Sequence, residues 1–153
     1  MANTYTQIFV HIVFAVQDRE CIIREQLRNE LEKYITGIVN NNKSKLIAIY
    51  CNPDHTHLLV SLHPAISVAT ITGDIKSGSS KWINGNHKIM GKFNWQDGYG
   101  GFSCSKSQLH DISSYIINQP IHHKTKTFRE EYLETLRKSE IDYNDAYLFN
   151  WID

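Results

Sequence analysis

The fold is decided by residues 52–60, Asn52-Pro53-Asp54-His55-Thr56-His57-Leu58-Leu59-Val60, in which two histidines open an apolar run. Successive side chains of a β-strand point to opposite faces of the sheet. His55 and His57 therefore share one face, and the side chains of the other parity, Thr56, Leu58, Val60 and Leu62, form the core face. Two imidazoles roughly 7 Å apart along a strand can meet one cation at about 2.1 Å. The stretch predicts a buried strand that carries a two-histidine metal site.

Strands and helices alternate around this stretch. Residues 5–16 and 45–51 are apolar and rich in Ile, Val and Phe, which predicts strands, and the turn residues 52–54 return the histidine strand antiparallel to 45–51. Residues 22–41 carry an apolar stripe at helical spacing. Ser67 can cap a second helix, and residues 102–104 form a short strand candidate.

The resulting order is strand, helix, strand, strand, helix, strand. This order predicts an α+β fold, a ferredoxin-like split βαβ plait with an antiparallel sheet and helices on one face. In that plait the first and third strands are central, so the histidines lie in mid-sheet. We found no linker or repeat, and we expect residues 1–153 to form a single domain.

Additional helices follow the plait. Ser105 and Gln108 form a capping box that opens a helix to about Asn118, with Pro120 just beyond. Thr127 and Glu130 form a second capping box, which opens a helix to about residue 138. Residues 141–153 are rich in aromatic side chains, so we expect this tail to pack against the rest of the chain.

Composition excludes some classes of protein and leaves others open. Hydrophobic residues make up 41% and charged residues 21% of the 153, which is typical of a globular chain. A formal net charge of zero does not favour a nucleic-acid partner, but opposite charges on different faces would still permit one. The three cysteines form no C-x-x-C pair, and no signal peptide or membrane span is present. We expect a cytoplasmic protein with reduced thiols.

Other residues are candidates for the same site. Tyr115 and Gln119 are four residues apart, so on one helix they share a face and offer a phenol and a neutral oxygen ligand. This pair on its own is more often a half-buried tyrosine and a surface glutamine. His63 has the parity of the histidine pair but lies roughly 20 Å along the strand from His57, too far for the same metal. Residues 122 and 123, both histidines, fit an ordinary polar loop better than a site.

Three further features remain open at this point. His11, inside the first strand, fits a hydrogen-bonded core histidine better than a site contact. Residues 76–81 are small, polar and basic, so Lys76 and Lys81 suit phosphate contacts and a solvated helix face equally well. Trp95 fits the core better than a nucleic-acid contact.

Four segments in this order resemble the single-tyrosine HUH transposases of small bacterial insertion sequences, the IS200-like family, and their REP-associated relatives. The segments are residues 53–60, 76–81, 95–102 and 115–119, and the resemblance continues through the His-His-Lys sequence at 122–124 and the Phe-Arg-Glu-Glu-Tyr helix at 128–132. The resemblance implies a metal-dependent nuclease and strand transferase that acts on single-stranded DNA through a 5′-phosphotyrosine intermediate. His55, His57 and Gln119 would hold Mg²⁺ or Mn²⁺, and Tyr115 would be the nucleophile.

The resemblance also implies partners. These are DNA hairpins at the ends of the mobile element and a second copy of the chain, in a homodimer whose subunits share active sites. One alternative is a non-catalytic single-strand binder on an RRM-like plait, which would need exposed aromatic residues on its strands. Another is a domesticated relative that processes host repeats. A metal hydrolase on a barrel of about 250 residues is excluded by length.

Overall fold

The computed structural model describes residues 3–18 and 21–152. Its helices and strands follow the predicted order and continue into the C-terminal helices: β1 Phe9–Ala15, α1 Glu25–Asn41, β2 Lys45–Cys51, β3 His55–Ser61, α2 Val68–Gly85, β4 Gly100–Cys104, η2 Lys106–Gln108, α3 Leu109–Ile117, α4 Gln119–His122, α5 Phe128–Lys138 and η3 Asp145–Tyr147. The predicted ferredoxin-like plait is confirmed.

The sheet is antiparallel, with strand order β2-β3-β1-β4. β1 and β3 are the two central strands, as the sequence predicts. His57 pairs with Val13 of β1 on one side and with Tyr50 of β2 on the other. Because neighbouring strands hold β3 on both sides, the histidine backbone is firmly fixed within the sheet.

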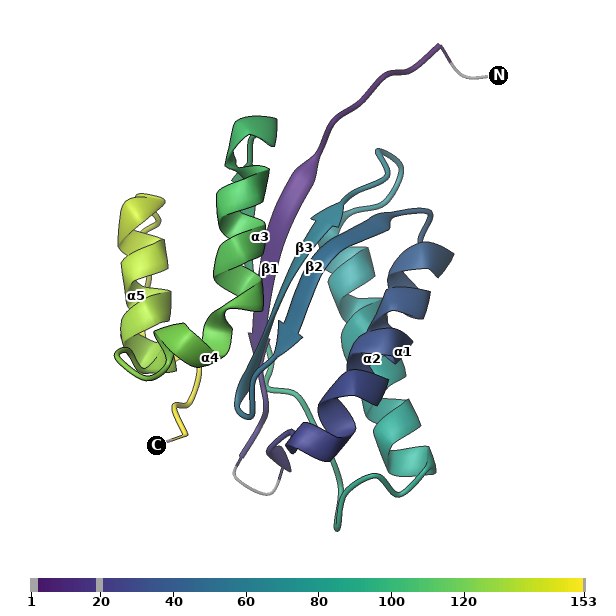
Figure 1. The fold of residues 1–153 in the computed structure, drawn as a ribbon, viewed down its shortest axis with the longest axis vertical. Helices are drawn as coiled ribbons and strands as arrows, with labels where there is room; N and C mark the ends of the chain where they lie inside the picture. Colours follow the sequence, from purple (N-terminus) through teal and green to yellow (C-terminus); the bar gives the residue numbers. More distant parts are fainter. Residues whose placement is uncertain (1–2, 19–20, 153) are drawn as a thin grey trace.

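Helices cover both faces of the sheet (Figure 1). α1 and α2 lie on one face over the main core, which receives Leu58 and Val60 of β3. α3, α4 and α5 lie on the opposite face, and Leu59 of β3 packs there against Ile116 of α3. Alternation along β3 therefore turns the histidine face toward the C-terminal helices, while the fully buried Thr56 points into the main core.

Thr56 introduces a hydroxyl into that core. Its Oγ1 makes no hydrogen bond of normal geometry among the described residues. The thiol of Cys51, which pairs with Thr56 across the β2–β3 ladder, interacts with it. The polar atom is therefore accommodated beside sulfur and makes no contact with the histidine face.

The predicted helix has its capping box at Ser105 and Gln108 and ends near Asn118 as expected, but the prediction that it also carries Gln119 is wrong. It begins with the short helix η2 and ends at Ile117, so Gln119 belongs to the separate helix α4. Pro120 explains the break, because proline lacks the N–H that would continue the helix and disfavours helical backbone at the preceding residue. Asn118 adopts φ −92° and ψ 20° at this point. Tyr115 and Gln119 therefore lie near each other across a bend.

Part of the C-terminal tail packs against α5 through aromatic side chains. Phe149 and Trp151 join the cluster formed by Phe128, Tyr132 and Leu136 of α5, so the predicted docking is confirmed for this part of the tail. Tyr147, in contrast, is 87% exposed. Within residues 3–18 and 21–152, no helix combines the length and hydropathy that crossing a membrane requires.

The fit of α5 onto the sheet can be tested at Gly100. A Cβ atom there would lie 2.6 Å from the hydroxyl of Tyr132 and 3.0 Å from the ring of Phe102. Gly100→Ala is expected to lower the free energy of unfolding by about 1–3 kcal/mol through overpacking. Gly73→Ala, inside α2 with open space around it, is the matched control and should stabilise by about 0.5–1 kcal/mol. Urea denaturation of both variants measures the difference, and equal stabilities would contradict this packing.

Candidate active site

His55 and His57 lie side by side on the sheet face that the C-terminal helices cover. Both are buried, with 1% and 3% of their surface exposed. Their ring centroids are 5.0 Å apart and the rings are nearly perpendicular. The ring of His55 stacks on that of Phe128, with 3.7 Å between the ring centroids. The predicted pair therefore shares a face and is held by packing.

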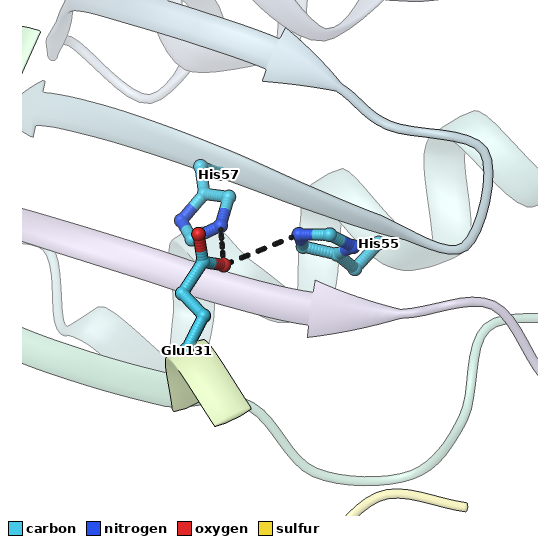
Figure 2. A group of neighbouring side chains, drawn as sticks. All are labelled: His55, His57 and Glu131. Atoms are coloured by element: carbon cyan, nitrogen blue, oxygen red, sulfur yellow. Dashed lines mark hydrogen bonds and ion pairs between the residues drawn. The ribbon is translucent and has the colours of Figure 1, made fainter. Parts of the chain in front are cut away.

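A carboxylate from α5 meets this pair (Figure 2). Oε1 of Glu131 lies 2.8 Å from Nε2 of His57 and 3.4 Å from Nε2 of His55. Glu131 is itself buried. Sequence reasoning missed this residue, although it lies three positions after Phe128 and next to Tyr132 on the buried side of α5. A carboxylate on a buried helical stripe was the signal that would have identified it.

The three groups fit a divalent cation. Their ligand atoms all lie within 4.8 Å of one another. Ligands about 2.1 Å from a shared ion lie about 3.0–3.4 Å apart at octahedral or tetrahedral angles, and the distances of 2.8 and 3.4 Å from Oε1 of Glu131 to the two Nε2 atoms bracket that range. Two imidazoles and one carboxylate suit several divalent metals, so the donor set fits a metal without selecting one.

A second layer of groups orients the two rings. Nδ1 of His55 lies 2.7 Å from Oδ1 of Asp54, and Nδ1 of His57 lies 2.8 Å from Nε2 of His11. Nε2 of each ring faces Glu131, and Nε2 of His55 also lies 3.3 Å from Nδ2 of Asn52. His11 is a hydrogen-bonded buried histidine, as predicted, and it also touches the site, which was the less favoured interpretation.

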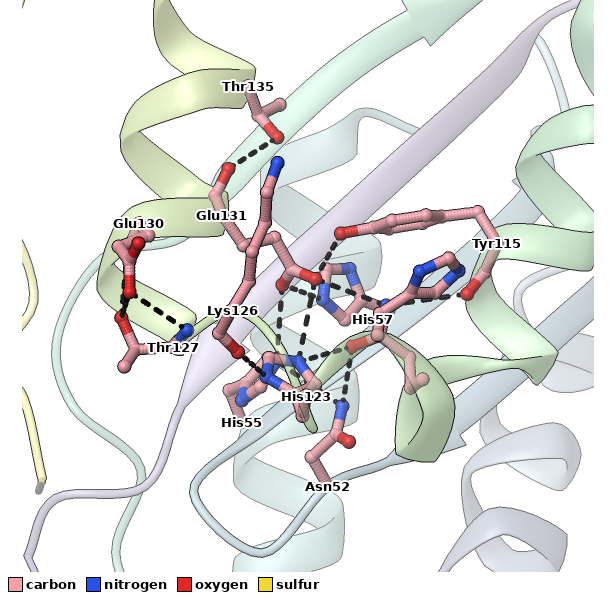
Figure 3. Close-up of polar contacts among 12 residues, drawn as sticks. Asn52, His55, His57, Tyr115, His123, Lys126, Thr127, Glu130, Glu131 and Thr135 are labelled. Carbon is pink, nitrogen blue, oxygen red and sulfur yellow. Dashed lines mark hydrogen bonds and ion pairs between the residues drawn. The ribbon is translucent and has the colours of Figure 1, made fainter.

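Tyr115 reaches the same carboxylate from α3 (Figure 3). Its phenol donates a hydrogen bond to Oε2 of Glu131, and its ring centroid lies 5.9 Å from that of His57. Burial and the bond to Glu131 both raise the pKa of the Tyr115 phenol above its usual value. The structure therefore brings the predicted nucleophile and the predicted metal ligands together within one chain.

Gln119 is fully buried at the edge of this group. Its Nε2 donates to Oε2 of Glu131 at 3.3 Å, while its Oε1 accepts from Nδ2 of Asn52 at 3.0 Å and is paired with Nε2 of His123 at 2.8 Å. In this structure Glu131, and not the amide oxygen of Gln119, faces the two Nε2 atoms. The bend at Asn118 orients the Gln119 side chain in this way.

The histidines after Pro120 also belong to the site, so their interpretation as an ordinary polar loop is wrong. Nε2 of His123 lies 3.4 Å from Oε2 of Glu131, and its ring centroid is 4.9 Å from that of His55. The ring of His122 lies 4.7 Å from that of Tyr115. The turn that Pro120 imposes folds these residues back onto β3, which no periodic pattern in the sequence indicates.

Electrostatics keep two of the three donors, Glu131 and His57, in the forms that a cation needs. Burial alone would raise the pKa of Glu131, but hydrogen bonds from His123, His55 and His57 outweigh it and hold the pKa well below the usual range. Burial lowers the pKa of His57 to about 4, so its ring is neutral. Burial opposes charge on His55, yet Asp54 and Glu131 raise its pKa. Glu131 is thus ionised, and His57 has a lone pair to offer.

A cleft of about 570 Å³ opens beside the cluster. Asn52 and His123 form part of its wall, together with the basic residues Lys124, Lys126 and Arg129 and the half-buried ring of Trp151. Sequence reasoning did not single out these cations. All three follow α4 in the sequence.

The predicted phosphate contacts lie elsewhere. Lys76 and Lys81 belong to α2, on the opposite face of the sheet (Figure 1). Nζ of Lys76 donates to the carbonyl oxygens of Gln96 at 2.6 Å and Gly98 at 2.9 Å, whereas Lys81 is exposed. His63 accepts a hydrogen bond from the Ala65 N–H beyond the end of β3. None of the three joins the cluster around Glu131.

Comparison with known proteins shows which family this chain belongs to. The family model described as "Transposase IS200 like" matches residues 4–119. The chain belongs to the IS200-like transposase family. The predicted activity, that of a DNA transposase of the single-tyrosine HUH type, is confirmed at this level. Glu131 and all of α5 lie outside the residues that the family model matches.

Named relatives agree with this assignment. The ISDra2 transposase TnpA of Deinococcus radiodurans is 23% identical over 118 residues, which cover 74% of this chain and 84% of that protein. A crystal structure of a transposase candidate from Deinococcus radiodurans R1 has a TM-score of 0.61 at 20% identity, covering 78% of this chain and 95% of the other. A REP-associated tyrosine transposase bound to a REP hairpin also scores 0.61, at 13% identity and 80% and 73% coverage. The two structural likenesses concern the fold.

Proposed function

We propose that this transposase cuts and rejoins single-stranded DNA, with Tyr115 as nucleophile and with Mg²⁺ or Mn²⁺ held by His55 and His57. The observation that supports this most is the meeting of the Tyr115 phenol and both histidines on the carboxylate of Glu131 (Figure 3). We propose Glu131 as the acidic ligand. Gln119, the ligand that the family resemblance implies, lies next to it and would complete the donor set by turning its amide.

The chemistry follows from the groups present. A cation at this site would supply positive charge that stabilises the negative charge developing on the scissile phosphate. Oη of Tyr115 attacks phosphorus, the Oη–P bond forms, and the bond from phosphorus to the 3′ oxygen breaks. The phenolic proton passes to Oε2 of Glu131, which accepts its hydrogen bond, and the departing 3′ oxygen takes up a proton from water to leave as a hydroxyl.

The product of this step is a 5′-phosphotyrosine. Because one phosphodiester has been exchanged for another, a later 3′ hydroxyl can reverse the step on a new strand without ATP. This exchange is what excision and insertion of a small element require. Flanking genomic sequence decides whether the strands are the ends of a mobile element or the repeats of a host.

We propose DNA hairpins as the substrate, in line with the relative that was solved with a REP hairpin. The cleft beside the site supports this proposal. Lys124, Lys126 and Arg129 offer charges for phosphates, and Trp151 offers a ring on which an unpaired base can stack. Lys76 and Lys81 remain proposed contacts for a more distant part of the hairpin, on the other face of the sheet.

The family resemblance implies a homodimer whose subunits share active sites. The distances in this structure support a different arrangement within each site, because Tyr115 contacts Glu131 of its own chain. We propose that one chain of residues 1–153, acting as a single domain, cuts DNA with its own tyrosine. A dimer is compatible with this proposal if each subunit keeps its own site.

Mixing two inactive variants distinguishes these arrangements. Tyr115→Phe lacks the nucleophile and His57→Ala lacks a metal ligand, so shared sites would restore about one good site per mixed dimer. We expect no recovery beyond the sum of the two variants, measured by cleavage of a labelled hairpin after the proteins are co-expressed with different tags and purified as a mixed pair. Recovery of a substantial fraction of wild-type activity would contradict the single-chain site.

The function itself is tested with wild-type protein, single-stranded end hairpins and Mg²⁺ or Mn²⁺ on a denaturing gel. We expect a covalent protein–DNA adduct that EDTA prevents and that His57→Ala lowers at least about 100-fold at limiting metal. Hairpin binding without cleavage at any concentration of either cation would instead favour the RRM-like binder.

A further inference from the structure

His11 on β1 lies behind one of the two metal-binding histidines. The β1–β3 register pairs Val13 with His57, so His11, two residues before Val13, is a diagonal neighbour of His57 on the same face. Nε2 of His11 is 2.8 Å from Nδ1 of His57. The rings are 25° from parallel with centroids 5.1 Å apart, and His11 is only 8% exposed.

Two neutral imidazoles in this contact must divide their protons in a defined way. Each neutral ring has one N–H and one lone pair. The short contact therefore needs the N–H on one of the facing atoms and the lone pair on the other. If His57 offers its Nε2 lone pair to a cation, its proton lies on Nδ1 and is donated to Nε2 of His11.

The contact to Glu131 sets the opposite arrangement when no cation is bound. Oε1 of Glu131, 2.8 Å from Nε2 of His57, belongs to an ionised carboxylate that can only accept. Nε2 of His57 then carries the proton, its Nδ1 accepts, and His11 donates from Nε2. On cation binding each ring would move its proton from Nε2 to Nδ1, which reverses the hydrogen bond without a net gain or loss of protons.

We propose that His11 is a positioning residue that accepts the hydrogen bond from Nδ1 of His57 in its cation-binding tautomer and holds its ring in place; this inference rests on the metal site proposed above. A neutral ring at His11 keeps the charges of the site in balance. Asp54, behind His55, and Glu131 together carry two negative charges, which match one divalent cation. A third carboxylate in place of His11 would leave an unbalanced charge in a buried cluster.

The test measures cation binding directly, with Mn²⁺ titrated into the full chain and free Mn²⁺ followed by electron paramagnetic resonance. We expect His11→Phe to weaken binding about 10–100-fold, the usual effect of removing the group that orients a ligating histidine. His11→Gln, whose amide oxygen can accept from Nδ1 of His57, should recover most of that loss. His63→Gln, a histidine outside the cluster, is the control and should leave the affinity unchanged.

A second measurement avoids any variant in this pair. Long-range ¹H–¹⁵N spectra of histidine-labelled wild type report the tautomer of each ring. We expect His57 and His11 to change from the Nε2–H to the Nδ1–H form when saturating Mg²⁺ is added. Unchanged tautomers, or Mn²⁺ affinity in His11→Phe equal to wild type, would overturn this inference and leave the metal site intact. Failure of wild type to bind either cation would overturn both.

Discussion

Tyr115→Phe is expected to abolish the covalent adduct and to lower strand cleavage by at least about 1000-fold, because the reacting oxygen is removed. The ring that packs against His122 and His57 remains, and Glu131 retains its contacts with the histidines and with Gln119. The fold should therefore survive, with a change in the free energy of unfolding of about 1 kcal/mol.

The matched control for this variant is Tyr147→Phe. Tyr147 is 87% exposed and lies far along the tail, so its loss should leave cleavage within about twofold of wild type, as expected for a surface position. Both variants are compared in single-turnover cleavage of a labelled hairpin, with thermal melting to verify the fold. A Tyr115→Phe protein that still forms the adduct would contradict the nucleophile assignment.

Glu131→Gln is expected to weaken Mn²⁺ binding at least about 10–100-fold and to lower cleavage accordingly at limiting metal. The substitution keeps the size of the side chain but removes the negative charge that faces Nε2 of both histidines. Glu134→Gln is the matched control, because Glu134 lies one turn along α5 and, among the described residues, forms ion pairs with Lys126 and Lys138 and none with the histidines.

A third variant separates the two candidate ligands. If Gln119 holds the cation and Glu131 does not, Gln119→Ala will lose Mn²⁺ affinity while Glu131→Gln retains it. We expect Glu131→Gln to have the larger effect, since a carboxylate interacts more strongly with a divalent cation than an amide does. Titrations of both variants under the same conditions decide between them, and a Glu131→Gln affinity equal to wild type would contradict a ligand role for Glu131.

Much of the fold could be predicted because its signals are local. The parity of residues 52–60 predicts which side chains of β3 face the core, and the turn at Asn52–Asp54 predicts the antiparallel pairing with β2. The capping box at Thr127 and Glu130 predicts the start of α5, where both hydrogen bonds are present. Each of these features depends on residues within a few positions of one another.

The missing parts of the site depend on contacts between distant elements. Glu131 meets His57 across 74 positions of sequence, and His11 meets it across 46. Strand register and helix docking decide these contacts, and neither is encoded in a local pattern. The family resemblance extends over residues 128–132, but it implies Gln119 and not Glu131 as the third ligand, and the family model itself ends at residue 119. A charged residue on an otherwise apolar helical stripe, as Glu131 is on α5, is the sequence feature that could have indicated this ligand.

The central claim is that one chain joins Tyr115 to DNA at the metal site of His55, His57 and Glu131. Mass spectrometry of the peptides from the trapped adduct tests this most directly, because the chain contains eight tyrosines. We predict a nucleotide linked through its 5′ phosphate to Tyr115 alone, formed with Mg²⁺ or Mn²⁺ and absent with EDTA. A nucleotide on any other tyrosine, or an equal yield without metal, would contradict the account.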